Sequence, residues 1–213
     1  MIKAVIFDLD GVLADTAKYH FLAWLSIAKE LNIPFAEQDN ERLKGVSRTE
    51  SLDILLSLGN LTLSESEKEQ YLARKNKLFV DFINLMTPNE IFPGVVSFIK
   101  ELRSEGYKIA LGSVSKNAEA VLSVLGIADL FDAVVSGKMI KNSKPDPEVF
   151  LLASELLHIP PHECVVVEDA AAGAEAAAAA GMKCIGISSH PLKKTVATLP
   201  HTGDIDIALI KKL

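Results

Sequence analysis

Two carboxylates follow an apolar run at the start of the chain, in the string Phe7-Asp8-Leu9-Asp10-Gly11. Residues i and i+2 of a strand point to the same side, so Asp8 and Asp10 face the same way. At about 4 Å and an effective dielectric near 20, two such charges repel by about 4 kcal/mol. A fold tolerates this repulsion where a cation or a proton lies between the acids, which indicates a site for a hard metal ion. The alternative is a pair of turn-forming aspartates before Gly11.

Further polar side chains stand where other apolar runs end. Ser113 follows one run, Glu168 and Asp169 end another, and Lys144 lies in a proline-rich loop before a helical pattern. In a parallel sheet these strand ends share one edge, so we expect them to meet Asp8 and Asp10. Four carboxylates and one lysine require a divalent cation, and oxygen-only ligands favour Mg²⁺. No cluster of histidines and cysteines suggests zinc.

The elements that must position these residues alternate along the chain. Short apolar runs predict buried strands at 3–8, 108–112, 164–168 and 183–187. Helical patterns lie between or beside them, at 93–105, 117–125, 147–157 and 171–180. This alternation predicts an α/β fold whose core is a Rossmann-like, doubly wound parallel sheet covered on both faces.

One stretch interrupts the alternation. From about Thr16 to Pro88 the pattern is helical without strands, and Ser64 with Glu67 fits a capping box before a long helix. We therefore expect an all-helical cap domain at 16–88, inserted into a core of 1–15 and 89–213. Turn residues at both crossings indicate a hinge, so the cap would close over Asp8 and Asp10.

Composition restricts the classes of partner. The chain has 213 residues, and its 49% hydrophobic and 23% charged residues are ordinary for a globular protein. A net charge of −6 argues against nucleic acid or an anionic membrane, so an anionic substrate needs a locally basic pocket. Two cysteines in apolar runs, without a signal peptide or spanning segment, favour a cytoplasmic protein with free thiols. The sequence has no coiled-coil seam, so we expect a monomer.

Four motifs in order resemble those of the haloacid dehalogenase superfamily of phosphotransferases. They are Asp8-x-Asp10-Gly11-Val12, Ser113, Lys144-Pro145 and Glu168-Asp169. The helical insert after the first motif is similar to the small cap of that superfamily. Within that superfamily, the chain resembles the β-phosphoglucomutase subfamily. The resemblance rests on Thr16, His20 and the strings at 43–48 (LKGVSR), 74–76 (RKN) and 113–117 (SVSKN).

This resemblance implies an isomerase of carbohydrate metabolism that binds sugar phosphates and depends on Mg²⁺. It would interconvert β-D-glucose 1-phosphate and glucose 6-phosphate through an aspartyl-phosphate enzyme and β-glucose 1,6-bisphosphate. The first alternative is a sugar-phosphate phosphatase on the same scaffold, in which water attacks the aspartyl phosphate. The second is a non-catalytic sugar-phosphate binding protein.

The resemblance also implies a role for each matching residue. Asp8 would be the nucleophile and Asp10 the general acid/base, with a carboxyl pKa that desolvation and like charge raise. Mg²⁺ would be held by Asp8, the backbone carbonyl of Asp10, Glu168 and Asp169. The transferred phosphate would be bound by Ser113 and Lys144.

The remaining predicted residues bind the rest of the substrate or act through the cap. The distal phosphate would be held by Arg48, Ser115, Lys116 and Asn117. His20 and Lys75 would help to bring Asp10 into position when the cap closes. The other predicted substrate-binding residues are Thr16, Lys44, Gly45 and Val114. Thr16 is also placed to cap a helix, and the turn at Gly45 would present Arg48. Val114 is larger than the side chain that this pattern expects.

Overall fold

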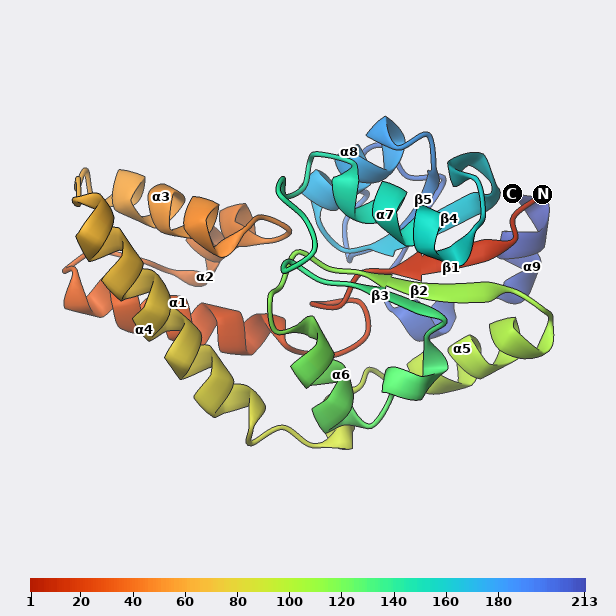
Figure 1. Cartoon of the computed structure of the whole chain (residues 1–213), viewed down its shortest axis with the longest axis horizontal. Coiled ribbons are helices and arrows are strands. Elements are labelled where there is room, and N and C mark those ends of the chain that lie inside the picture. Colours follow the sequence, from red (N-terminus) through yellow and green to blue (C-terminus); the bar gives the residue numbers. More distant parts are fainter.

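Six parallel strands form a single sheet in this computed structural model, which describes residues 1–213. The order across the sheet is β3-β2-β1-β4-β5-β6 (Figure 1). The strands are β1 (Ala4–Phe7), β2 (Lys108–Gly112), β3 (Ala133–Val135), β4 (Cys164–Glu168), β5 (Lys183–Ile187) and β6 (Ala197–Leu199). The four predicted strands are all present, whereas the sequence analysis missed the short β3 and β6.

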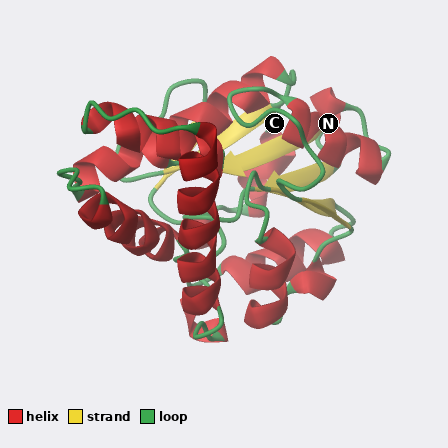
Figure 2. Ribbon diagram, turned by 60° about the vertical axis from the view of Figure 1, so that its left-hand side comes forward, coloured by secondary structure: helices red, strands yellow, loops and turns green.

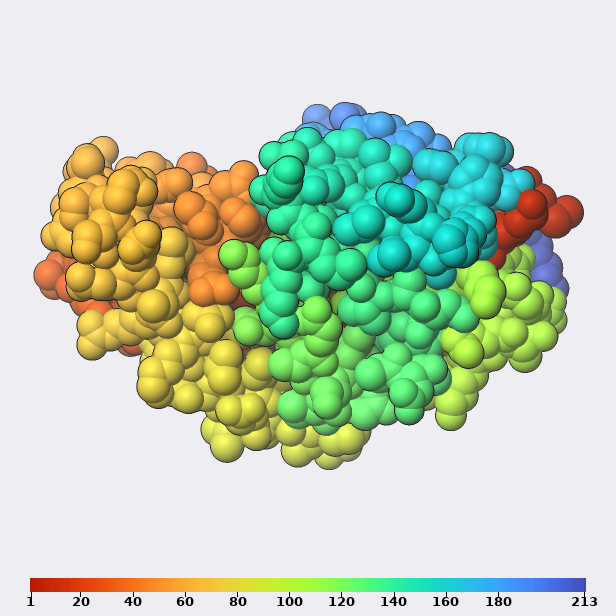
Figure 3. Space-filling model, in the orientation of Figure 1, coloured from red at the N-terminus to blue at the C-terminus, as the bar shows by residue number.

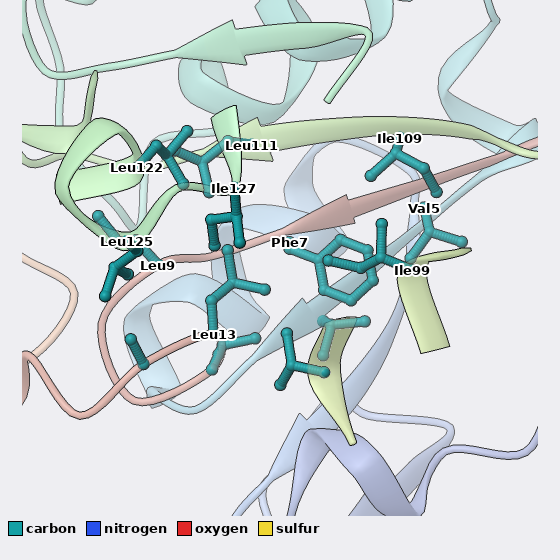
Figure 4. Close-up of a cluster of buried hydrophobic side chains, with 14 of the residues drawn as sticks. Val5, Phe7, Leu9, Leu13, Ile99, Ile109, Leu111, Leu122, Leu125 and Ile127 are labelled. Carbon is teal, nitrogen blue, oxygen red and sulfur yellow. The ribbon is translucent and has the colours of Figure 1, made fainter. Parts of the chain in front are cut away.

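Both faces of the sheet are buried, and β1 shows why its sequence is continuously apolar. Val5 and Phe7 pack into one hydrophobic cluster, while Ala4 and Ile6 pack into another on the opposite face. The ring of Phe7 lies edge-on to that of Phe98, with centroids 6.2 Å apart. Figure 4 shows Phe7 in its cluster, near Val5 and Ile99. A strand covered on both faces has no polar positions to alternate with apolar ones.

Helices cover the two faces (Figure 2). One face carries α5 (Val95–Ser104), α6 (Ala118–Leu125) and α9 (Ile207–Lys212), and the other carries α7 (Glu148–Leu157) and α8 (Ala171–Ala179). This is the doubly wound α/β arrangement that the sequence predicts. The alanines of α8 allow a close approach to the sheet, since Ala174 and Ala177 are fully buried. None of the helices has both the length and the apolar character that a bilayer span needs.

Four helices in a row follow the first strand (Figure 1), and Figure 3 shows the atoms of this part of the chain, in orange to yellow, toward one end of the molecule. They are α1 (Ala17–Glu30), α2 (Glu37–Asn40), α3 (Arg48–Leu58) and α4 (Glu65–Ile83). Helices α1 and α3 share a hydrophobic cluster built on Trp24, Leu52 and Leu55, and α4 packs against it through Tyr71 and Leu72, whereas α2 buries no residue. We propose that 16–88 is a cap domain and that 1–15 and 89–213 form the core. Short 3₁₀ turns complete the chain, at Glu41–Leu43, Pro88–Glu90, Ala128–Leu130, Pro161–Glu163 and Thr202–Asp204.

The chain crosses into and out of this helical segment at adjacent positions. Ala14 and Ile91 form an isolated antiparallel bridge, and the backbone N–H of Asp15 donates to the carbonyl of Glu90 at 3.0 Å. The Glu90 carboxylate also accepts from the Tyr19 hydroxyl at 3.0 Å. The two crossings therefore lie side by side, as a hinge requires.

Candidate active site

The carboxyl ends of three neighbouring strands bring the predicted core residues together. β1 lies between β2 and β4, so its carboxyl end is the switch point where ligands bind in such sheets. Asp8 follows β1, and Glu168 is the last residue of β4. Lys144 reaches both from the loop before α7, with Nζ 2.5 Å from Asp8 Oδ1 and 2.8 Å from Glu168 Oε2. The result is a buried ion triad at this edge.

Three acids form a cluster that fits a divalent cation. Asp8, Glu168 and Asp169 each offer a carboxylate oxygen, and these oxygens lie within 4.8 Å of one another. Burial, together with Glu168 and Asp10, raises the pKa of Asp8 from 3.8 to about 7 despite the opposing charge of Lys144. Burial and the charges of Glu168 and Asp8 also raise the pKa of Asp169. One ammonium does not balance three acids, so a bound cation would relieve their repulsion.

Two glycines make room for these carboxylates. Gly11 has a φ of +80°, and a Cβ there would lie 2.3 Å from Asp169 Oδ2. Gly173 stands in the first turn of α8, where a Cβ would lie 2.0 Å from the carboxyl carbon of Glu168. A side chain at either position would displace an acid of the cluster.

The raised pKa of Asp8 predicts how pH and a divalent cation act together on stability. Because the folded-state pKa of about 7 exceeds the ordinary 3.8, protonated Asp8 favours the folded state at low pH. That contribution is complete below the unfolded pKa and is lost as the pH rises through about 7. We therefore expect the gain in Tm on adding millimolar Mg²⁺ to be small at about pH 5 and several degrees at about pH 8.

Differential scanning fluorimetry with and without chelator would measure this gain. The Asp8→Asn variant is the control, because it lacks this titrating carboxyl. Its gain should vary less with pH than that of the parent protein, and the variation that remains comes from Asp169, whose pKa is also raised. Equal gains in the parent protein at both pH values would show that Asp8 does not exchange a proton for the cation.

The side chain of Asp10 points away from the acidic cluster. Its Oδ1 accepts from the Thr16 hydroxyl at 2.5 Å and lies 3.6 Å from His20 Nε2. Burial alone would raise the pKa of Asp10, but His20, Thr16 and Lys75 lower it below its ordinary value. The expectation of a raised pKa for Asp10 is therefore wrong, because these neighbours outweigh desolvation. Asp10 begins as a carboxylate that can accept a proton, and Thr16 caps α1 by position without a side-chain cap bond.

Lys75 lies behind Asp10 in an apolar enclosure. Its ammonium is 2.8 Å from His20 Nδ1 and lies over the rings of Trp24 and Phe79, 5.2 and 4.8 Å from their centroids. Burial and the charge of Arg48 lower the pKa of Lys75 to about 7. When Lys75 is protonated it can only donate to Nδ1, so the ring proton of a neutral His20 is then on Nε2, the nitrogen that faces Asp10.

A cavity of about 1150 Å³ lies between the helical segment and the sheet edge. The predicted residues that line it are Asp8, Asp10, His20, Lys44, Gly45, Arg48, Lys75, Val114, Ser115, Lys116, Asn117 and Asp169. Thr16, Ser113, Lys144 and Glu168 lie behind its wall, fully or almost fully buried. The structure thus gathers all the predicted residues at one site, in two layers.

Two cations without an acidic partner line the cavity, although the whole chain is acidic. Arg48 Nη1 donates to the carbonyl of Leu72 at 3.3 Å, and neither Arg48 nor Lys116 has an acidic partner. Burial lowers the pKa of Arg48, which nevertheless remains a cation at neutral pH. Two unpaired cations facing a cavity are suited to an anionic group of a ligand.

Sequence reasoning missed three polar residues at this site, namely Asn76, Ser143 and Glu50. Asn117 stands at the start of α6, but its side-chain amide donates to Asn76 Oδ1 at 3.0 Å instead of capping the helix. The Ser143 hydroxyl donates to Glu50 Oε2. Asn76 stands in a string that the analysis used only for Lys75. Glu50 could have been found from Ser47-x-x-Glu50, the same capping-box pattern recognised at Ser64.

Comparison with known proteins agrees with this geometry. A family model described as haloacid dehalogenase-like hydrolase matches residues 2–181. The chain belongs to this family. Membership of this family explains the parallel sheet and the acids at its edge, as the four motifs imply.

Relatives within the haloacid dehalogenase-like hydrolases cover nearly the whole chain. β-Phosphoglucomutase of Bacillus subtilis is 41% identical over 211 residues, which are 98% of this chain and 93% of the relative. A phosphorylated carbohydrates phosphatase of Thermotoga maritima is 36% identical over 212 residues, 98% of this chain and 94% of the relative. The crystal structure of β-phosphoglucomutase from Clostridium difficile is 41% identical, with a TM-score of 0.95 over 100% of this chain and 96% of that one.

Proposed function

We propose that the protein is a Mg²⁺-dependent β-phosphoglucomutase. It interconverts β-D-glucose 1-phosphate and glucose 6-phosphate through an aspartyl-phosphate enzyme and β-glucose 1,6-bisphosphate. The observation that carries this proposal is a single cavity lined both by Asp8 and by the cations Arg48 and Lys116, which have no acidic partner. A substrate with a phosphate at each end of a sugar matches that arrangement, and the two similar β-phosphoglucomutases support it.

The first half-reaction moves a phosphoryl group from the bisphosphate to the protein. Asp8 attacks phosphorus, and the bond from phosphorus to the sugar oxygen breaks. That oxygen takes from Asp10 the proton that Asp10 accepted from a sugar hydroxyl in the other half-reaction of the cycle. Mg²⁺ held by Asp8, Glu168, Asp169 and the Asp10 carbonyl would supply positive charge to the carboxylate and phosphate oxygens. Lys144 adds a fixed positive charge beside Asp8, and Ser113 would help to bind the same phosphate.

The second half-reaction uses Asp10 as a base. A sugar hydroxyl attacks the phosphoryl group on Asp8, and Asp10 accepts its proton as the aspartyl bond breaks. The lowered pKa of Asp10 suits this direction, because a carboxylate at neutral pH is ready to accept. The Thr16 hydroxyl holds that carboxylate in place by a hydrogen bond, and His20 Nε2 lies 3.6 Å from the same oxygen.

The cap supplies the grip on the phosphate that does not react. Arg48 begins α3 and lines the cavity with Lys116, Ser115 and Asn117 of the core. One sugar must present both of its phosphates to Asp8 in turn, so this group holds whichever phosphate is distal. Lys44, Gly45 and Val114 also line the wall and would contact the sugar or shape the space around it.

Replacing Arg48 with Ala is expected to separate the two parts of the reaction. We expect mutase flux to fall by about 10²-fold or more, because a charged hydrogen-bonding group for the distal phosphate is lost. Formation of aspartyl phosphate from acetyl phosphate, which has no second phosphate, should change by less than about threefold. The two rates are measured by a coupled assay and by intact-protein mass spectrometry.

Arg74→Ala is the matched control, since Arg74 is an exposed arginine of the same helical segment paired with Glu30 at 2.9 Å. It should leave both rates near the parental values. An equal fall of both rates in Arg48→Ala would mean that Arg48 is not a ligand of the distal phosphate.

A sugar-phosphate phosphatase is the second candidate, favoured by the 36% identity to the Thermotoga maritima phosphatase. One assay separates the two candidates. β-Glucose 1-phosphate is incubated with Mg²⁺ and a trace of the bisphosphate, and glucose 6-phosphate and free phosphate are followed together. Rapid glucose 6-phosphate with little free phosphate supports the mutase, whereas free phosphate without isomerised sugar supports the phosphatase. The absence of both products would overturn the proposal, and so would full activity in the presence of chelator.

We further propose that the protein acts as a cytoplasmic monomer without nucleic-acid or membrane partners. The net charge of −6 and the two buried free cysteines fit this proposal. Gel filtration with light scattering would test the monomer.

A further inference from the structure

Two side-chain hydrogen bonds join residues of the helical segment to residues of the core that line the same cavity. Asn117 donates to Asn76, and Ser143 donates to Glu50. The first pair contains Asn117, which already has a proposed role at the distal phosphate. The second pair contains no residue with a proposed role, although Glu50 and Ser143 both line the cavity.

Glu50 is linked on its own side to the start of the helix that carries Arg48. Its Oε2 accepts from the Ser47 backbone N–H at 2.9 Å and from the Ser47 hydroxyl at 2.7 Å, which completes the capping box of α3. Arg48 is the first residue of that helix. The Glu50 carboxylate therefore moves with the turn that positions Arg48.

Ser143 is linked on its side to the buried lysine of the core. It directly precedes Lys144, whose ammonium contacts Asp8 and Glu168. The loop before Ser143 is tied to α7, because Glu148 accepts from the backbone N–H groups of Lys141 and Asn142 at 3.0 and 2.7 Å. The Ser143 hydroxyl thus projects from a fixed loop toward the start of α3, as the two segments lie in Figure 1.

We propose that Glu50 is a positioning residue whose hydrogen bond from Ser143 holds the cap closed on the core. One oxygen then couples the turn that carries Arg48 to the loop that carries Lys144. Burial alone would raise the pKa of Glu50, but the hydrogen bonds from Ser143 and Ser47 lower it, so the acceptor is charged at neutral pH. The pair is exposed to water, so the bond is weak enough to open again when the intermediate must turn around.

The chain contains its own control for the capping box. Glu67 accepts from the Ser64 backbone N–H at 2.8 Å and from the Ser64 hydroxyl at 2.6 Å, in the same arrangement at the start of α4. Glu67 has no partner in the core. Glu67→Ala therefore removes a capping box of the same segment without touching the contact between Glu50 and Ser143.

Energy transfer between two fluorophores measures the closed fraction in ligand-free protein. The labels are attached to cysteines introduced at the exposed Glu65 of α4 and Glu155 of α7, since both native cysteines are buried. We expect Ser143→Ala to lower the ratio of closed to open molecules about fivefold, and Ser143→Thr to restore it. Adding Ser143→Ala to Glu50→Ala should cause no further change, and Glu67→Ala should match the parent protein.

An unchanged ratio in Ser143→Ala, or the same decrease in Glu67→Ala, would overturn the proposal. A kinetic measurement follows, and this part alone rests on the proposed function. Ser143→Ala should raise KM for the bisphosphate about fivefold and leave aspartyl-phosphate formation from acetyl phosphate unchanged. If the parent protein had no mutase activity but the ratio responded as expected, the function would be wrong and the role of Glu50 would stand.

Discussion

Replacing Asp8 with Asn is expected to lower kcat for the mutase reaction by about 10⁴-fold or more. An amide cannot attack phosphorus to form the acyl phosphate, and no other carboxylate can take its place. Glu168 is fully buried behind the cavity wall, and Asp10 is held by Thr16 and His20. The coupled assay measures the loss of turnover. Intact-protein mass spectrometry after reaction with acetyl phosphate should show one added phosphoryl group on the parent protein and none on Asp8→Asn.

Asp53→Asn is the matched control, because Asp53 is a half-exposed carboxylate paired with Lys68 at 2.9 Å. It should retain parental activity and accept the phosphoryl group. Roughly a tenth of the parental kcat remaining in Asp8→Asn would exclude Asp8 as the nucleophile. Equal and negligible turnover in the parent protein and in Asp8→Asn would favour the non-catalytic binding protein.

Replacing Lys144 with Met is expected to have the largest effect on stability. Lys144 is fully buried, and its contacts with Asp8 and Glu168 raise its ammonium pKa although burial opposes this. Methionine keeps an unbranched apolar side chain but removes the ammonium, whose nitrogen lies 4.8 Å from the centroid of the Phe150 ring. Breaking a buried ion pair in this way costs about 3–5 kcal/mol of unfolding free energy. Urea unfolding at neutral pH without divalent cation would measure the loss.

The same variant tests the assignment of the acidic cluster. Millimolar Mg²⁺ should restore part of the stability, because the cation replaces the missing charge among the acids. We also expect kcat to fall by about 10³-fold, since a preorganised positive charge at the reacting group is lost. Lys138→Met is the control, an exposed lysine 3.0 Å from Glu119 that should change neither quantity appreciably. Unaltered stability of Lys144→Met in chelator would contradict the ion triad.

The core fold could be predicted because its signals are local. A strand such as β1 is apolar at every position since both of its faces are covered, and a glycine or an asparagine marks the ends of several helices. The missed strands lack that signal. β3 and β6 have three residues each, and β6 is half-exposed along its length. Three residues are too few to distinguish a strand from an apolar loop.

The chemistry of the site was predictable only in part. Asp8, Lys144 and Glu168 follow from motifs at strand ends, because a parallel sheet brings those ends together. The lowered pKa of Asp10 could not be foreseen, since its cause is a group of neighbours from α1 and α4. In the sequence Lys75 stands among other basic residues and suggests an exposed helix face. Only the packing of α4 against α1 shows that its ammonium is buried beside His20.

The bridge between Ala14 and Ile91 makes the helical segment resemble the loop of a very long hairpin. The polypeptide leaves the sheet and returns to it at one point, so the order of the strands does not depend on what lies between. Such an insert can lengthen, shrink or be exchanged by recombination while the acids at the sheet edge keep their places. During evolution, substrate specificity can thus change through the inserted helical segment while the phosphoryl-transfer chemistry of the core is kept.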